Sequence, residues 1–239
     1  MKSYLTLLVS ILFLGMLQGA RHALVIGNSE YSEKKLENTI NDATDMAAKF
    51  KELGFQTVMK TNLDLSVFEA EIDNLVARIS PADEVVLYYA GHGVQIEGIN
   101  YLIPVNARIS TEVQCKHRAM SCNYILEALQ KASVSILILD ACRNNPYAWS
   151  RSVGRGLASM EGKAGSQYII YSTAAGLEAD DGSGNNSPFT AALKKHIGSP
   201  NLTVEDMMRK VIKEVEALTE NKQTPAAYGN LRDRFYFNQ

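Results

Sequence analysis

The sequence lacks the short motifs that mark common nucleotide, zinc and serine-hydrolase sites. It contains no GxxxxGKS or GxxxxGKT loop, no HExxH helix, no CxxC pair and no GxSxG turn. No basic block accompanies the net charge of −2 at pH 7, which argues against a nucleic-acid partner. Internal repeats and low-complexity tracts are also absent. With 239 residues, of which 46% are hydrophobic, the chain is long enough for one well-filled domain.

A long membrane-spanning run is missing too, because the main apolar stretch is short and lies at the start of the chain. Residues 1–20 combine Lys2 with the apolar run LTLLVSILFLGML, whereas a spanning helix needs about twenty apolar residues. This arrangement is typical of a signal peptide, with cleavage expected near Gly19 or Ala20. Since the cleavage site matches the A-x-A pattern poorly, an uncleaved membrane anchor is the alternative. In either case we expect residues 21–239 to be exported, to the periplasm or as a secreted protein.

Cysteine is scarce, with only Cys115, Cys122 and Cys142 present. An odd number in an exported chain indicates one bridge and one free thiol. Cys115 and Cys122 share one short polar stretch, QCKHRAMSC, and can form that bridge, which leaves Cys142 as the free thiol. The alternative is three reduced cysteines, two of them without a chemical role.

Apolar runs alternate with amphipathic segments along the chain, which predicts an α/β fold. Strands are expected at residues 23–28, 55–60, 84–93, 133–146, 166–174 and near 235–237, and a hairpin at 94–104. Helices are expected at residues 41–53, 66–79, 122–131, about 189–196 and 204–219. Asn41 or Asp42 should lie near the N-cap of the first helix. This alternation predicts a mostly parallel central sheet with helices on both faces.

Two chemically reactive residues follow expected strands of this sheet. His92 lies in AGHG after VVLYY, and Cys142 lies in DACRN after ILIL. Because ligands bind beyond the carboxyl ends of parallel strands, we expect both side chains at one edge. A thiol peptidase needs a thiolate and an adjacent imidazole, and glycines beside the histidine allow a substrate backbone to approach. A packing role is the alternative for either residue alone. Packing is a less ordinary explanation when the two residues occur together.

The motifs YYAGHG and LDACRN resemble those of caspase-like cysteine peptidases, whose histidine lies about fifty residues before the cysteine. The resemblance extends from Arg21 to Phe237. It implies a caspase-like sandwich with a large-subunit part ending near residue 147, a linker at 147–166 and a small-subunit part at 167–239.

The same resemblance implies the roles of individual residues. His92 is the expected general base and Cys142 the expected nucleophile. The backbone N–H groups of Gly93 and Cys142 are expected to hold the oxyanion. This chemistry needs no metal and no cofactor, although some metacaspases respond to calcium.

The residue two places before the nucleophile indicates the branch of the family. Caspases have QAC there, whereas Asp140 gives DAC, as in metacaspases and paracaspases, and the single-domain form is typical of bacteria. Those branches cleave after Arg or Lys, which they bind with acids. Ala90 and Thr39 depart from the Ser and Cys that are frequent in metacaspases, so the paracaspase-like interpretation is the better one.

Three acids match the positions that line the basic-residue pocket in those branches: Asp42, Asp140 and Asp181. Carboxylates placed around the planar guanidinium hold arginine best. A helix cap is the alternative for Asp42, and a solvated loop is the alternative for Asp181. Asp140 ends a buried strand and therefore needs a partner.

These features together predict a cysteine endopeptidase that acts on proteins or peptides with a basic residue before the scissile bond. A non-catalytic binding or scaffold domain of the same fold is the alternative. Arg151 and Arg155 lie in the linker and are expected sites of self-cleavage, unless that loop is an ordinary surface loop. Contact with a membrane is expected only if residues 1–20 remain attached.

Overall fold

The computed structural model describes residues 19–32, 35–142, 157, 166–174, 179, 181–182 and 184–239. Residues 1–18 of the predicted signal peptide or anchor and the predicted self-cleavage sites, Arg151 and Arg155, lie outside the described residues. Within the described ranges, no helix combines the length and apolar character needed to cross a membrane.

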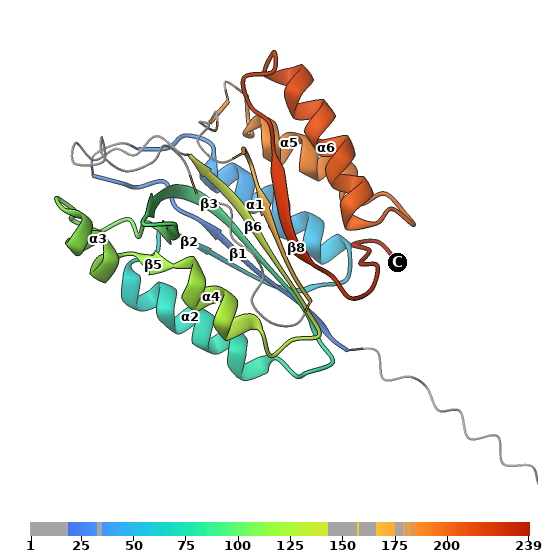
Figure 1. Ribbon diagram of the computed structural model, residues 1–239, viewed down its shortest axis with the longest axis horizontal. Coiled ribbons are helices and arrows are strands. Elements are labelled where there is room, and N and C mark those ends of the chain that lie inside the picture. Colours follow the sequence, from blue (N-terminus) through green and yellow to red (C-terminus); the bar gives the residue numbers. More distant parts are fainter. Residues whose placement is uncertain are drawn as a thin grey trace, which may run out of the picture.

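A central sheet in the order β2-β1-β3-β6-β7-β8 forms the middle layer of the molecule (Figure 1). Its strands are β1 (Arg21–Gly27), β2 (Gln56–Thr61), β3 (Glu84–Ile96), β6 (Val134–Cys142), β7 (Ser166–Tyr171) and β8 (Ala226–Asn230). The neighbouring pairs from β2 to β7 are parallel, and β8 is antiparallel to β7. Two short strands, β4 (Ile99–Leu102) and β5 (Met120–Ser121), extend β3 in an antiparallel manner. The predicted mostly parallel α/β sheet is confirmed.

Helices cover both faces of the sheet, as predicted (Figure 1). One face carries α1 (Thr39–Glu52), α5 (Pro188–His196) and α6 (Val204–Leu218), and the other carries α2 (Leu65–Arg78) and α4 (Cys122–Leu129). A short helix, α3 (Glu112–Arg118), precedes β5. Successive side chains of a strand point to opposite faces. Tyr88 therefore packs on the α1 side and Tyr89 on the α2 side, which explains why β3 is apolar at nearly every position.

The first helix begins earlier than expected, at Thr39, with Asn38 as its N-cap. The Asn38 side chain makes no capping bond, and its amide nitrogen donates to the backbone carbonyls of Asp181 and Gly182. The prediction of Asn41 or Asp42 near the cap was wrong. Asp42 instead lies within the first turn and is only 1% exposed.

β3 continues through the glycine-flanked histidine and ends at Ile96, three residues beyond the expected strand. It pairs with β6 as far as His92 and with β4 from Gly93 onward. The hairpin itself is confirmed, because Glu97 and Gly98 adopt φ values of 52° and 80° between the two strands.

The last strand is placed differently from the prediction near residues 235–237. The edge strand is β8, and the only pairing near the C-terminus in the described part is an isolated bridge between Thr203 and Tyr236. Phe235 and Phe237 are apolar because they fill the core on the α1 side, with their rings 5.0 Å apart. Alternation of large apolar residues here reflects packing and not strand pairing.

Candidate active site

The parallel register of β3 and β6 pairs His92 with Cys142. Neighbouring strands of a sheet lie about 4.8 Å apart, so the two backbone positions are close. Cys142 is the last residue of β6, and the pairing therefore lies at the carboxyl edge of the parallel sheet. The fold brings together the two positions that the motifs singled out.

Protein groups hold the backbone of His92 on both sides. Its N–H donates to the hydroxyl of Tyr31 at 2.9 Å. Its carbonyl oxygen accepts from the hydroxyl of Tyr89 at 2.8 Å and from the N–H of Ile103 at 3.0 Å. The imidazole is buried, and the ring of Tyr31 lies beside it with a centroid separation of 4.3 Å.

Gly93, the expected oxyanion donor beside the histidine, lies tightly against β6. A Cβ atom at this position would approach the Ala141 Cβ and the Leu157 Cδ2 to 3.2 Å each. Glycine therefore lets the backbone after His92 remain close to the end of the neighbouring strand.

Asp140 lies near the carboxyl end of β6, in a polar setting contributed by the start of α5. Its carboxylate accepts from the hydroxyl of Ser187 at 2.5 Å and from that of Thr190 at 2.8 Å. Burial raises the pKa of Asp140, the nearby charge of Asp181 raises it further, and the hydroxyl bonds act in the opposite direction. The partner that a buried acid requires is thus supplied by hydroxyl groups.

Asp42 reaches the same place from α1. Its carboxylate accepts from the side-chain amide of Asn186 at 3.0 Å and from the backbone N–H of Ser187 at 3.1 Å. Burial, and next the charge of Asp140, raise the pKa of Asp42 to about 8. The carboxyl of Asp42 is therefore largely protonated at neutral pH when nothing occupies the site.

Asp181 completes the group of acids and is held less deeply. Its side chain accepts from the backbone N–H of Glu37 at 2.9 Å. Its charge contributes to the raised pKa values of both Asp42 and Asp140. The three acids predicted for the basic-residue pocket come together between α1, β6 and the segment before α5.

No described Lys or Arg forms an ion pair with Asp42 or Asp140. Asn186, which donates to Asp42, accepts from Lys194 through its amide oxygen, while Lys194 is paired with Asp45. The acid cluster is thus suited to a cation supplied from outside. Within the described ranges, no group of three or more His, Cys, Asp or Glu residues is arranged to hold a metal ion.

The disulfide considered between Cys115 and Cys122 is not formed, because both are free and buried. Cys115 packs with Tyr31 and Ile103 beneath the β3–β4 hairpin, whereas Cys122 begins α4 and packs on the α2 side. Burial raises the pKa of Cys115 to about 12 and that of Cys122 even further. Both thiols are therefore poorly reactive, and their closeness in sequence does not bring them together.

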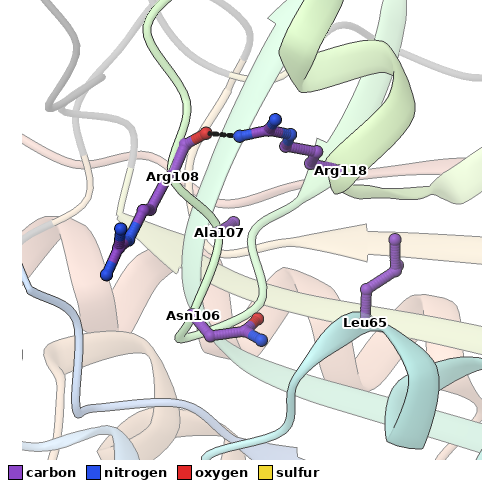
Figure 2. Close-up of a pocket in the computed structure, with 5 residues that line it drawn as sticks. All are labelled: Leu65, Asn106, Ala107, Arg108 and Arg118. Carbon is purple, nitrogen blue, oxygen red and sulfur yellow. Dashed lines mark hydrogen bonds between the residues drawn. The ribbon is translucent and has the colours of Figure 1, made fainter.

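A separate hollow of about 280 Å³ lies beside the start of α2 (Figure 2). It is lined by Leu65, Asn106, Ala107, Arg108 and Arg118. The Arg118 guanidinium donates to the backbone oxygen of Arg108 at 2.6 Å, and the Arg108 side chain points away from it (Figure 2). The two guanidinium groups do not converge, and none of the site residues predicted from the sequence lines this hollow.

Several residues of the site were not predicted from the sequence. Tyr31 and Tyr89 hold His92, while Asn186, Ser187 and Thr190 hold the acids. Only Ser187 carried a local signal, because a serine before proline at a helix start is a typical N-cap. The other contacts arise from packing between distant segments.

The fold and this edge of the sheet define a caspase-like protein. The sequence model of the caspase domain family matches residues 20–236. The chain therefore belongs to the caspase domain family, a family of cysteine peptidases, and the resemblance identified from its motifs is confirmed.

Individual relatives agree with this assignment. The human mucosa-associated lymphoid tissue lymphoma translocation protein 1 is 30% identical over 134 residues, which cover 52% of this chain and 15% of that protein. The homologue from Mus musculus gives the same identity and coverage. The chain thus spans a small part of the length of these relatives. The crystal structure of a Geobacter sulfurreducens protein matches with a TM-score of 0.70 and 16% identity, covering 92% of this chain and 97% of that one, and has the same fold.

Proposed function

We propose that the protein is a cysteine endopeptidase that cleaves after arginine, and less readily after lysine, through Cys142 and His92. The observation that carries this proposal is the register of β3 and β6, which sets His92 opposite Cys142 at the carboxyl edge of the sheet. Membership of the caspase domain family supports the same reaction class.

The proposed reaction begins when the His92 imidazole takes the proton of the Cys142 thiol. The thiolate attacks the carbonyl carbon of the scissile amide, and the N–H groups of Gly93 and Cys142 hold the oxygen that becomes negative. The C–N bond then breaks, and the amine leaves with a proton from the imidazolium. Water, deprotonated by His92, finally hydrolyses the thioester and regenerates the free thiol.

Specificity for a basic side chain follows from the acid cluster. Burial, and next the charge of Asp140, raise the pKa of Asp42, so an incoming guanidinium offsets the repulsion between the carboxyls and favours their ionised forms. Arginine is preferred over lysine because its planar fork can bond several carboxylate oxygens at once. A substrate with an acidic residue at this position would add to the repulsion.

The decisive experiment compares wild type with Cys142→Ala on short fluorogenic peptides that end in Arg, Lys or Asp. We expect hydrolysis in the order Arg, Lys, Asp for wild type, and a loss of at least about 10³-fold in kcat/KM for Cys142→Ala. Cys115→Ala is the matched control, because it removes a buried thiol outside the site. Wild type that hydrolyses none of the peptides would instead favour a non-catalytic scaffold of the same fold.

A further inference from the structure

We propose that Tyr31 is a positioning residue for His92, which fixes both the backbone and the imidazole of the general base. This inference rests on the proposed peptidase function. Tyr31 follows β1 in the sequence and reaches across to β3. His92 lies on β3, 61 positions after Tyr31.

The pairing of β1 with β3 ends at Gly27 opposite Ala90, and beyond that point the hydroxyl of Tyr31 replaces a β1 partner for His92. The N–H of His92 donates to this oxygen at 2.9 Å. The same hydroxyl donates to the carbonyl oxygen of Ile103 at 3.1 Å. Tyr31 thereby ties the histidine to the residue that follows β4.

A second tyrosine completes the bonding. Each phenolic hydroxyl has one proton to donate. The hydroxyl of Tyr31 donates to Ile103, and the hydroxyl of Tyr89 donates to the carbonyl oxygen of His92 at 2.8 Å. The two hydroxyl oxygens lie 3.1 Å apart, and each lies 3.1 Å from the carbonyl oxygen of Ile103. Both backbone groups of His92 are then bonded, which fixes the direction in which its side chain leaves the strand.

The aromatic ring of Tyr31 acts on the imidazole itself. The two ring centroids are 4.3 Å apart with an interplanar angle of 47°. A ring at this distance restricts rotation of the imidazole and keeps water from one of its sides. The imidazole becomes a cation when it takes the thiol proton, and an adjacent aromatic ring stabilises a cation.

Tyr31 is itself fixed, although it lies in a connection between a strand and a helix. Its side chain is only 9% exposed and packs in the cluster beneath the β3–β4 hairpin. The preceding Ser29 anchors the segment, because its N–H donates to the Asn62 side chain and its hydroxyl donates to the Leu36 carbonyl. Because Tyr31 is held in place, its hydrogen bond and ring contact can fix the position of His92.

The test uses Tyr31→Leu, which removes the ring and the hydroxyl, and Tyr31→Phe, which removes only the hydroxyl. On the Arg peptide we expect Tyr31→Leu to lower kcat about 100-fold with little change in KM, since misplaced catalytic groups cost about this much. Tyr31→Phe should recover most of this loss and remain within about tenfold of wild type, because one hydrogen bond is missing. Tyr101→Leu is the matched control, because Tyr101 is a buried tyrosine of the same cluster and pairs with Val94 on β3.

A second readout does not require peptide hydrolysis. The rate constant for alkylation of Cys142 by iodoacetamide reports its thiolate, which an adjacent and well-placed imidazole promotes. We expect Tyr31→Leu to slow this step about tenfold, as His92→Asn does, while Tyr101→Leu leaves it unchanged. A merely structural defect would affect Tyr101→Leu as well, so it would not produce this difference between the two variants.

The two readouts separate the two proposals. If wild type cleaves no peptide, the proposed function fails, and alkylation still tests the role of Tyr31. If wild type cleaves the Arg peptide but Tyr31→Leu matches Tyr101→Leu in kcat and in alkylation, the positioning role is wrong.

Discussion

Asp42 and Asp140 share one hydrogen-bonding neighbour, Ser187. Its backbone N–H donates to Asp42, and its hydroxyl donates to Asp140. Ser187 is also the N-cap of α5, where its side-chain oxygen accepts from the N–H of Thr190. The start of α5 therefore sets the distance between two carboxyls that come from α1 and β6.

Removing the charge of Asp140 should weaken recognition of arginine. Asp140→Asn keeps the size of the side chain, and we expect kcat/KM for the Arg peptide to fall about 100-fold, as for loss of a strong bond to a charged group. Steady-state kinetics on peptides that end in Arg and in Gln measure the effect. The ratio between the two peptides should collapse, because only the cationic substrate uses the carboxylate.

Asp45→Asn provides the matched control for this substitution. Asp45 lies on α1 near Asp42, but its carboxylate is paired with Lys194 and half-exposed. Its removal should leave the preference for Arg unchanged. Equal losses in Asp140→Asn and Asp45→Asn would mean that the acid cluster does not bind the substrate.

Arginine binding should release protons at neutral pH. In the unoccupied site the pKa of Asp42 is about 8, so its carboxyl is mostly protonated at pH 7. A bound guanidinium favours the ionised form and lowers this pKa. Affinity for an Arg peptide should therefore rise as the pH increases from about 6 to 8, by at most tenfold per unit for one proton.

This linkage can be measured without turnover. Calorimetry of Cys142→Ala with an Arg peptide, in two buffers of different ionisation enthalpy, gives the number of protons released. Asp42→Asn in the same background should abolish most of the release. Proton uptake, or an affinity that does not change with pH, would contradict the charge state derived for Asp42.

The sequence was sufficient for the parallel strands of the sheet and for the two reactive positions. Apolar runs such as ILIL before Cys142 and VVLYY before His92 are typical of buried strands. Parallel strands bring their carboxyl ends to one edge of the sheet. The convergence of Asp42, Asp140 and Asp181 came from the family resemblance and not from any local pattern. Their positions in the chain are far apart, and only packing of α1 against α5 joins them.

The parts that were missed depend on contacts over long sequence separations. Ser187 binds Asp42 across 145 positions, and Tyr31 binds His92 across 61. The strand β8, AAYGN, has no alternating apolar pattern, since two of its positions are exposed. Conversely, Phe235 and Phe237 alternate like strand residues but fill the core.

Self-cleavage should occur in the linker that follows the nucleophile. Arg151 and Arg155 provide the basic residue that the acid cluster is proposed to bind. Purified wild type should yield two fragments whose masses place the cut after one of these arginines, while the double variant Arg151→Gln, Arg155→Gln remains intact and still hydrolyses the Arg peptide. Cys142→Ala that is clipped at the same place in isolation would refute self-cleavage.

Thermal stability should not depend on a disulfide. Cys115 and Cys122 are both free and lie in different clusters, so a reductant has no bond to break between them. The melting temperature should be the same with and without dithiothreitol, and alkylation after denaturation should label both thiols. A fall of several degrees on reduction would indicate a bridge, because a native disulfide contributes about 2–5 kcal/mol.

Gly91 should be the least replaceable glycine near the histidine. A Cβ atom there would lie 2.6 Å from the hydroxyl oxygens of both Tyr31 and Tyr89. Since these two hydroxyls hold His92, Gly91→Ala must displace them or the strand, and we expect it to lower the free energy of unfolding by roughly 1–3 kcal/mol.

Gly184→Ala is the control, because a Cβ atom at that position meets no atom within 4 Å. Urea denaturation of the two variants measures the difference, and Gly91→Ala should lose peptidase activity as well, even at temperatures where it remains folded. Equal stability and equal activity of the two variants would show that the hydroxyls can move aside, and that the network around His92 is looser than these distances indicate.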